Sequence, residues 1–127
     1  MDTKSTHILA EYWGIHPSLL SDVEQLRNAL LVAAGVAHAK AVDSVFHTFD
    51  HKGVTGVIVV EESHFAIHTW PEKGYVACDF FTHGEECDPM AAHNVLIEVL
   101  GVEKWHLLEV DRGIPDTIPR TSPLASS

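Results

Sequence analysis

Four short segments rich in β-prone residues follow one another in the middle of the chain, with only turns between them. They cover roughly residues 41–49, 54–61, 64–70 and 74–82, and the turns at 50–53 and 71–74 both end in glycine. Such turns favour hairpins, which join neighbouring strands in antiparallel order. Looser alternation at residues 8–13 and 105–110 predicts one more strand near each end. The chain is therefore expected to build a mainly antiparallel sheet.

Two amphipathic helices interrupt this series of strands. In the first, apolar residues recur at helical spacing from a start near Ser18 to a stop at Gly35. In the second, Asp88-Pro89 supplies the cap and the first residue, and Gly101 ends the apolar stripe. The order β-α-β-β-β-β-α-β predicts an α+β fold, a two-layer α/β sandwich with both helices on one side of the sheet. The Pro- and Ser-rich residues 113–127 are expected to form a surface tail.

The length of 127 residues fits a single domain, residues 1–127. With 18 acidic and 8 basic residues, the net charge of −10 disfavours nucleic acid and either favours the approach of a cation or simply keeps the protein soluble. No apolar run is long enough for a membrane span, and the N-terminus lacks the layout of a signal peptide. We therefore expect a cytoplasmic protein with no membrane partner, in which Cys78 and Cys87 stay as thiols.

The segment 57–72 carries the residues best suited to chemistry. Ser63 follows Glu62 directly, with imidazoles at His64 and His68, so a potential nucleophile lies beside potential proton carriers. The two histidines share one face of a strand but lie about 13 Å apart, too far for one ion without bending. We therefore assign no metal. A serine hydrolase is disfavoured because no Gly-x-Ser-x-Gly elbow surrounds Ser63.

The run Glu-Ser-His-x-x-Ile-His-Thr-Trp-Pro-Glu-x-Gly-Tyr at residues 62–75 resembles the self-cleavage motif of the short prokaryotic (class 1B) S-adenosylmethionine decarboxylases. The similarity covers nearly the whole chain, through residues 46–49, 53–57 and 81–84, and only the tail is weakly similar. It implies that the chain breaks without hydrolysis into 1–62 and 63–127. Ser63 then becomes an N-terminal pyruvoyl group, so that no external cofactor is needed.

The resemblance also implies roles for individual residues in self-cleavage. The Ser63 hydroxyl attacks the Glu62 carbonyl, and His68 takes the proton that elimination releases; the alternative for His68 is a hydrogen-bonded core histidine. Thr55 stands where the family usually has a serine whose hydroxyl assists processing. Threonine keeps the hydroxyl, but its methyl group restricts the rotamer, so we expect slower processing.

For the substrate, the resemblance implies that Phe49 stacks on the adenine ring and that Glu72 holds the ribose hydroxyls. Trp70 is either a pocket residue or a core residue. The pyruvoyl carbonyl would form a Schiff base with the substrate amine and take up electrons as carbon dioxide leaves. The product, decarboxylated S-adenosylmethionine, would be the aminopropyl donor for spermidine synthesis.

The clearest departure from the family lies at His83, where the pattern normally has a cysteine that protonates the substrate carbon. An imidazole titrates near neutral pH and can donate a proton, so we expect His83 to take this role. Cys87 is the only thiol that could substitute for it, because Cys78 should face the opposite side of the strand. The acidic run around Cys87 is otherwise a solvated loop, or a site for the distal cation of a basic amino acid.

Two other functions remain open from the sequence. The same pyruvoyl chemistry could act on ornithine or arginine, although Phe49 and Glu72 favour a nucleoside substrate. A non-enzymatic paralogue is disfavoured by the intact Glu62-Ser63 pair and His68. The resemblance further implies a homodimer in which two sheets pack into a four-layer α/β/β/α arrangement, with active sites near the interface.

Overall fold

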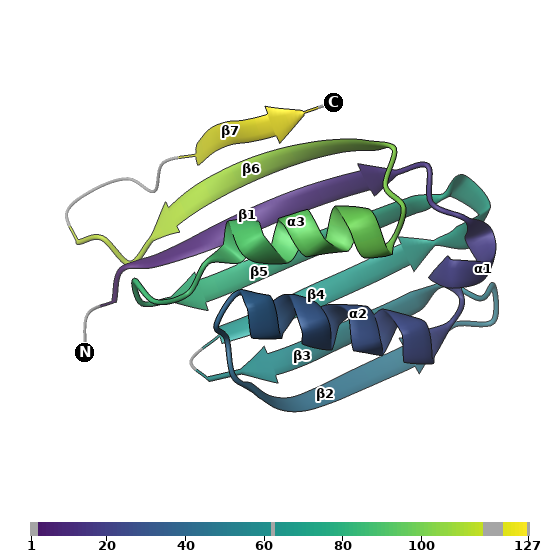
Figure 1. Cartoon of the computed structure of the whole chain (residues 1–127), viewed down its shortest axis with the longest axis horizontal. Coiled ribbons are helices and arrows are strands. Elements are labelled where there is room, and N and C mark those ends of the chain that lie inside the picture. The colour runs from purple at the N-terminus through teal and green to yellow at the C-terminus, as the bar shows by residue number, and fades with distance from the viewer. Residues whose placement is uncertain (1–2, 62, 116–120, 127) are drawn as a thin grey trace.

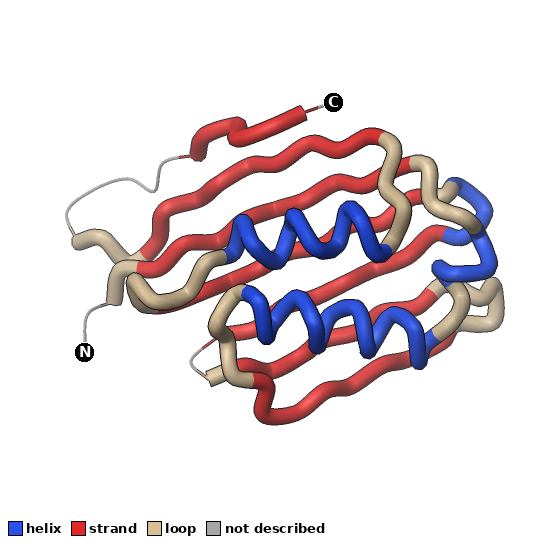
Figure 2. Tube along the Cα trace, in the orientation of Figure 1, coloured by secondary structure: helices blue, strands red, loops and turns tan. Residues whose placement is uncertain are grey.

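The predicted hairpins form one antiparallel sheet in the computed structural model, which describes residues 3–61, 63–115 and 121–126. Within these residues the strand order is β2-β3-β4-β5-β1-β6-β7, so that β1 lies between β5 and β6 (Figures 1 and 2). The strands are β1 (Ser5–Trp13), β2 (Ala41–Thr48), β3 (Val54–Val60), β4 (Ser63–Trp70), β5 (Tyr75–His83), β6 (Lys104–Arg112) and β7 (Thr121–Ser126).

Both long helices cover the same face of the sheet, as Figure 1 shows. They are α2 (Val23–Val36) and α3 (Pro89–Val99), and the short α1 (Pro17–Leu20) precedes them. Helix α2 packs over β2 and β3, and α3 over β1 and β5. The layer between helices and sheet is the core, where the largest fully buried side chains include Tyr12, Leu30, Phe65, Phe80 and Leu96. The predicted two-layer α+β sandwich is confirmed.

The predicted bounds of the first helix are wrong. The chain makes one turn in α1, and a new helix starts at Val23 because Asp22 caps it: its carboxylate accepts from the Gln25 amide N–H at 3.1 Å and from the Gln25 side chain at 2.8 Å. These bonds lower the pKa of Asp22. The helix also continues through Gly35 to Val36, and the left-handed residue beyond its end is His38, with φ of 61°.

The predicted surface tail contains a strand. Thr121–Ser126 forms β7, which pairs antiparallel with β6. Strand β6 would otherwise leave a row of unpaired backbone groups at the edge of the sheet, and the tail supplies their partners. Pro123 is tolerated because it lies on an edge strand.

The opposite face of the sheet, called the open face below, carries no described helix (Figure 1). Register places His64, His68 and Trp70 of β4 on this face, beside alternate residues of β3 and β5. Cys78 faces the helices instead and is buried, which raises the pKa of its thiol. None of the described helices is long and apolar enough to cross a membrane.

The core contains one histidine, His93 of α3, which is 2% exposed. Its Nδ1 and the Tyr12 hydroxyl share a hydrogen bond of 2.7 Å. Burial lowers the pKa of His93, because the charged imidazolium is poorly solvated there. The neutral form is therefore the one compatible with the packed core.

We expect acid to destabilise the fold through this histidine. In the unfolded chain His93 binds a proton near its ordinary pKa, whereas in the folded chain burial disfavours protonation. The free energy of unfolding therefore falls as the pH drops below about 6.5. Chemical denaturation at pH 7.5 and pH 5 measures this loss, in a chain that carries Ser63→Ala to prevent the cleavage expected from the sequence. In a His93→Asn background the loss should be smaller than in His106→Asn, where an exposed histidine is replaced. Equal losses in the two backgrounds would exclude His93 as the source.

Candidate active site

Ser63 is the first residue of β4 and pairs with Val60, the last residue of β3. This register turns its side chain toward the helix-covered face. Its Oγ is buried and has no hydrogen-bond partner among the described residues. A buried hydroxyl without a partner is costly, which marks it as a candidate reactive group. Glu62, whose carbonyl carbon the Ser63 hydroxyl is predicted to attack, lies outside the described residues.

Thr55 and His68 face each other across β3 and β4. The Thr55 Oγ1 and the His68 Nδ1 lie 3.3 Å apart, within hydrogen-bond reach. Both residues are half-buried on the open face. His68 is therefore oriented by a hydroxyl group and remains reachable, which differs from the alternative of a core histidine.

A cavity of about 230 Å³ adjoins this pair and is lined by Phe49, His51, Val54, Thr55, His68, Thr69 and Trp70. The Phe49 ring is exposed on one side and stacks on His51, with ring centroids 5.5 Å apart. Trp70 packs against Tyr75, at 5.1 Å between centroids, and the Tyr75 hydroxyl donates to Glu11. Trp70 is thus a cavity residue and is not in the core. Glu72 lies two residues beyond it in an exposed 3-10 turn (Pro71–Lys73) and does not line the cavity.

His83 ends β5 and lines two other cavities, of about 510 and 280 Å³. Cys87 lines both of them as well, and its Sγ donates to the His38 carbonyl at 3.7 Å. Glu61, next to the predicted cleavage point, lines the larger cavity and pairs with Lys40 at 3.8 Å. The acidic loop at 85–86 completes that lining. Two imidazoles, a thiol, three carboxylates and the Lys40 ammonium group therefore line the larger cavity.

The predicted site residues fall into two groups at opposite ends of β4. Ser63 and His83 lie at the end where β4 begins, because β5 runs antiparallel to it. Thr55, His68 and Trp70 lie where β4 ends. Five residues of extended chain separate Ser63 from His68 by about 16 Å, and the odd spacing turns the two side chains to opposite faces. Within one chain of this shape, His68 does not reach Ser63.

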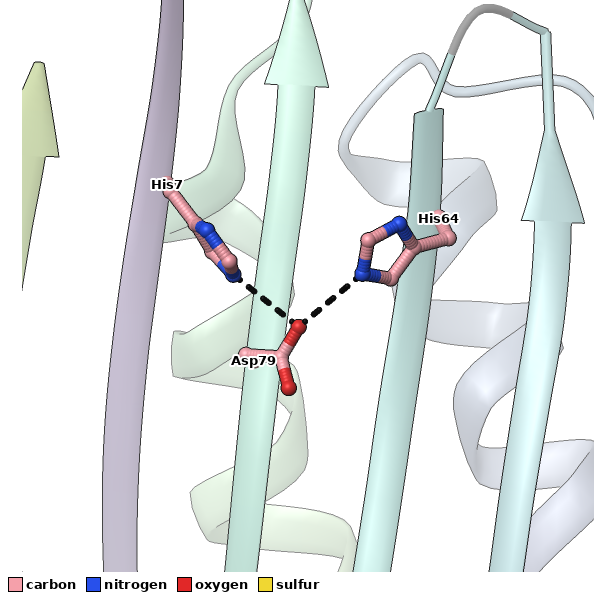
Figure 3. A group of neighbouring side chains, drawn as sticks. All are labelled: His7, His64 and Asp79. Atoms are coloured by element: carbon pink, nitrogen blue, oxygen red, sulfur yellow. Dashed lines mark hydrogen bonds and ion pairs between the residues drawn. The ribbon is translucent and has the colours of Figure 1, made fainter. Parts of the chain in front are cut away.

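A third group was missed in the sequence (Figure 3). Asp79 of β5 accepts hydrogen bonds at Oδ1 from His7 Nε2 of β1, at 3.0 Å, and from His64 Nε2 of β4, at 3.2 Å. All three side chains are half-buried on the open face. Their positions in the chain give no sign of this contact, because it depends on the pairing of β1 with β5.

The likeness to known proteins covers almost all of the chain. Residues 6–113 match the family described as S-adenosylmethionine decarboxylase. The S-adenosylmethionine decarboxylase proenzyme of Thermosipho africanus is 42% identical over 125 residues, which cover 97% of this chain and 96% of that protein. The proenzyme of Pelotomaculum thermopropionicum is 44% identical over 115 residues, covering 91% and 89%. The crystal structure of the Aquifex aeolicus adenosylmethionine decarboxylase superposes with a TM-score of 0.82 at 30% identity, covering 93% and 98%.

The chain belongs to the S-adenosylmethionine decarboxylase family. Its fold matches the solved family structure, which agrees with the two-layer α+β sandwich predicted from the order of helices and strands. Against the site expected for an S-adenosylmethionine decarboxylase, the structure brings Phe49, Thr55, His68 and Trp70 together around one cavity. It brings His83 and Cys87 together around another. Within one chain, the half of the site that contains Ser63 lies apart from the half that contains His68.

Proposed function

We propose that this protein is a self-processing, pyruvoyl-dependent decarboxylase of S-adenosylmethionine. The observation that carries the proposal is the buried hydroxyl of Ser63 at the start of β4, which has no hydrogen-bond partner in the part of the chain that the structure describes, in a family whose relatives are named proenzymes. Ser63 is suited to form the pyruvoyl group, because the atoms of this serine would become the atoms of the group. When formed, that group supplies an electrophilic carbonyl that accepts the electron pair left as carbon dioxide departs.

Self-processing starts from the Ser63 hydroxyl. Its oxygen attacks the carbonyl carbon of residue 62 and the amide nitrogen leaves, so that an ester replaces the peptide bond. His68 then removes the Ser63 Cα proton, and β-elimination releases residue 62 with a new C-terminal carboxylate. The resulting dehydroalanine tautomerises to an imine, and water releases ammonia from it, leaving a ketone at the new end of the chain. The expected products are residues 1–62 and 63–127.

We further propose that the site is completed in a homodimer. The half-site with Ser63 and His83 would meet the half-site with Thr55 and His68 of the partner subunit. The open face supports packing of two sheets, because large apolar residues lie exposed on it: Leu9 at 38%, Val45 at 68% and Val59 at 43%. A two-fold axis that runs across β4 through the middle of such an interface would bring the opposite ends of β4 together.

In this assembly Phe49 would stack on the adenine ring and Glu72 would hold the ribose hydroxyls, while Trp70 lines the pocket. The net charge of −10 favours approach of the sulfonium cation. The cytoplasm is the proposed location, since a reducing compartment keeps Cys78 and Cys87 as thiols.

The test of the function offers S-adenosylmethionine, ornithine and arginine side by side to the purified protein and measures release of carbon dioxide. We expect release from S-adenosylmethionine only. Release of carbon dioxide from ornithine or arginine, but not from S-adenosylmethionine, would show that the proposed substrate is wrong. The three carboxylates near His83 would then be the candidates for binding the distal cation.

The same assay tests His83 as the proton donor to the substrate carbon. His83→Ala should leave cleavage at 62–63 intact and lower turnover by about 10²-fold or more, as expected for loss of a general acid. Cys87→Ala is the matched control, because it removes a side chain from the same two cavities. Unchanged turnover in His83→Ala together with a large loss in Cys87→Ala would assign the proton to the thiol.

A further inference from the structure

Three donor atoms converge on the open face outside both groups of predicted site residues (Figure 3). They are the Nε2 atoms of His7 and His64 and the Oδ1 of Asp79, all within 4.8 Å of one another. In the single chain the side chains are 18%, 39% and 23% exposed, so that an ion could reach them from water before the open faces of two chains pack together. We propose that His7, His64 and Asp79 form a binding site for a divalent metal ion of the zinc class.

The distances from the carboxylate oxygen to the two imidazole nitrogens fit such an ion. Zinc bonds of about 2.0–2.1 Å place neighbouring ligand atoms about 3 Å apart. The two imidazole nitrogens lie 3.0 and 3.2 Å from the carboxylate oxygen. Two imidazoles and one carboxylate suit zinc, cobalt, nickel or iron, whereas magnesium and calcium prefer sets made only of oxygen. The remaining coordination positions would be filled by water.

The sheet holds these donors in place before any ion binds. His7 and His64 both pair with Phe81, one from each neighbouring strand, and Asp79 lies two residues before Phe81 on the same face. The Phe81 ring packs against both imidazoles, with centroids 5.2 Å from His7 and 5.7 Å from His64. An ion here would join β1, β4 and β5, three central strands, and should therefore stabilise the fold.

In the observed arrangement, Arg112 disfavours the binding of an ion at His7. Its Nη1 lies 3.3 Å from the His7 Nδ1, and its guanidinium lies over the Phe81 ring at 4.5 Å. Arginine offers only donors, so the His7 Nδ1 accepts and the Nε2 carries the proton. An ion at Nε2 requires that proton to leave, and a metal-bound histidine normally donates its other N–H to an acceptor. Arg112 is exposed at the end of β6, so removing it should leave the three ligands in place.

The experiment is calorimetric titration of Zn²⁺ into the purified protein after treatment with a chelator. We expect one ion per chain and a rise in the midpoint of thermal unfolding. Asp79→Asn and His64→Ala should weaken binding by more than the roughly 10- to 100-fold that loss of an outer hydrogen-bond partner costs. His106→Ala, which removes an exposed histidine from the same face, should bind as the wild type does. Arg112→Ala should bind about tenfold more tightly.

Equal affinity in the wild type, Asp79→Asn and His64→Ala would overturn the site, since the chain has ten histidines that could bind zinc elsewhere. If the two ligand variants fail to fold, Arg112→Ala decides, because it retains every proposed ligand. Equal or weaker binding in that variant overturns the proposal. None of these results depends on cleavage at residue 63 or on decarboxylation.

Discussion

Ser63→Ala is expected to leave the chain in one piece of 14.0 kDa, whereas the wild type separates into residues 1–62 and 63–127. Alanine lacks the oxygen that would attack the carbonyl of residue 62. Decarboxylation should be lost completely, because the ketone would never form. Intact-mass spectrometry of both proteins measures the cleavage, and the wild-type fragment 63–127 should resist sequencing from its blocked end.

Ser44→Ala is the matched control, since it removes a half-buried hydroxyl from a neighbouring part of the same sheet. It should be cleaved as the wild type is. A full-length mass for folded wild-type protein would refute self-processing, and cleavage of Ser63→Ala at the same bond would transfer the reaction to another group.

His68→Ala is expected to stop processing at the ester, which hydroxylamine cleaves. Loss of the group that takes the Cα proton should slow formation of the ketone by about 10²-fold or more. The location of Ser63 and His68 at opposite ends of β4 makes a stronger prediction. When Ser63→Ala and His68→Ala chains are expressed together with different tags, the His68→Ala chain should be cleaved, because the partner subunit supplies its His68.

The control for this mixture replaces the Ser63→Ala partner with a chain that carries both substitutions. That partner offers the same association but no imidazole, so cleavage should disappear. If the first mixture gives no cleavage although mixed dimers form, the proton acceptor lies in the same chain and the segment around residues 61–63 must move to meet it. Complete processing of His68→Ala alone would remove His68 from the role.

Much of the fold follows from interactions between residues close in the chain. The hairpin turn at 50–53 and the cap at Asp88 both appear as predicted, because turn geometry and capping depend on a few neighbouring residues. The first helix shows where this reasoning fails. Apolar spacing alone joined α1 to α2, but the cap at Asp22 decided the break between them.

The cavity around Phe49 and His68 was within reach of the sequence, through the resemblance of its motif. The opposite orientation of Ser63 and His68 could also be predicted from the sequence, because side chains five residues apart on a strand point to opposite faces. Strand β7 could not be predicted from the sequence, because its pairing depends on the free edge that β6 presents after the sheet has formed.

The local pattern of alternation, turns and caps therefore determined the elements, and the motif determined the family and the candidate residues. The tertiary structure alone decided which side chains meet. His7 and Asp79 are separated by 72 residues and come together only because β1 inserts between β5 and β6. Strand order and register depend on how the whole sheet buries its apolar face against α2 and α3, and no short stretch of sequence carries that information.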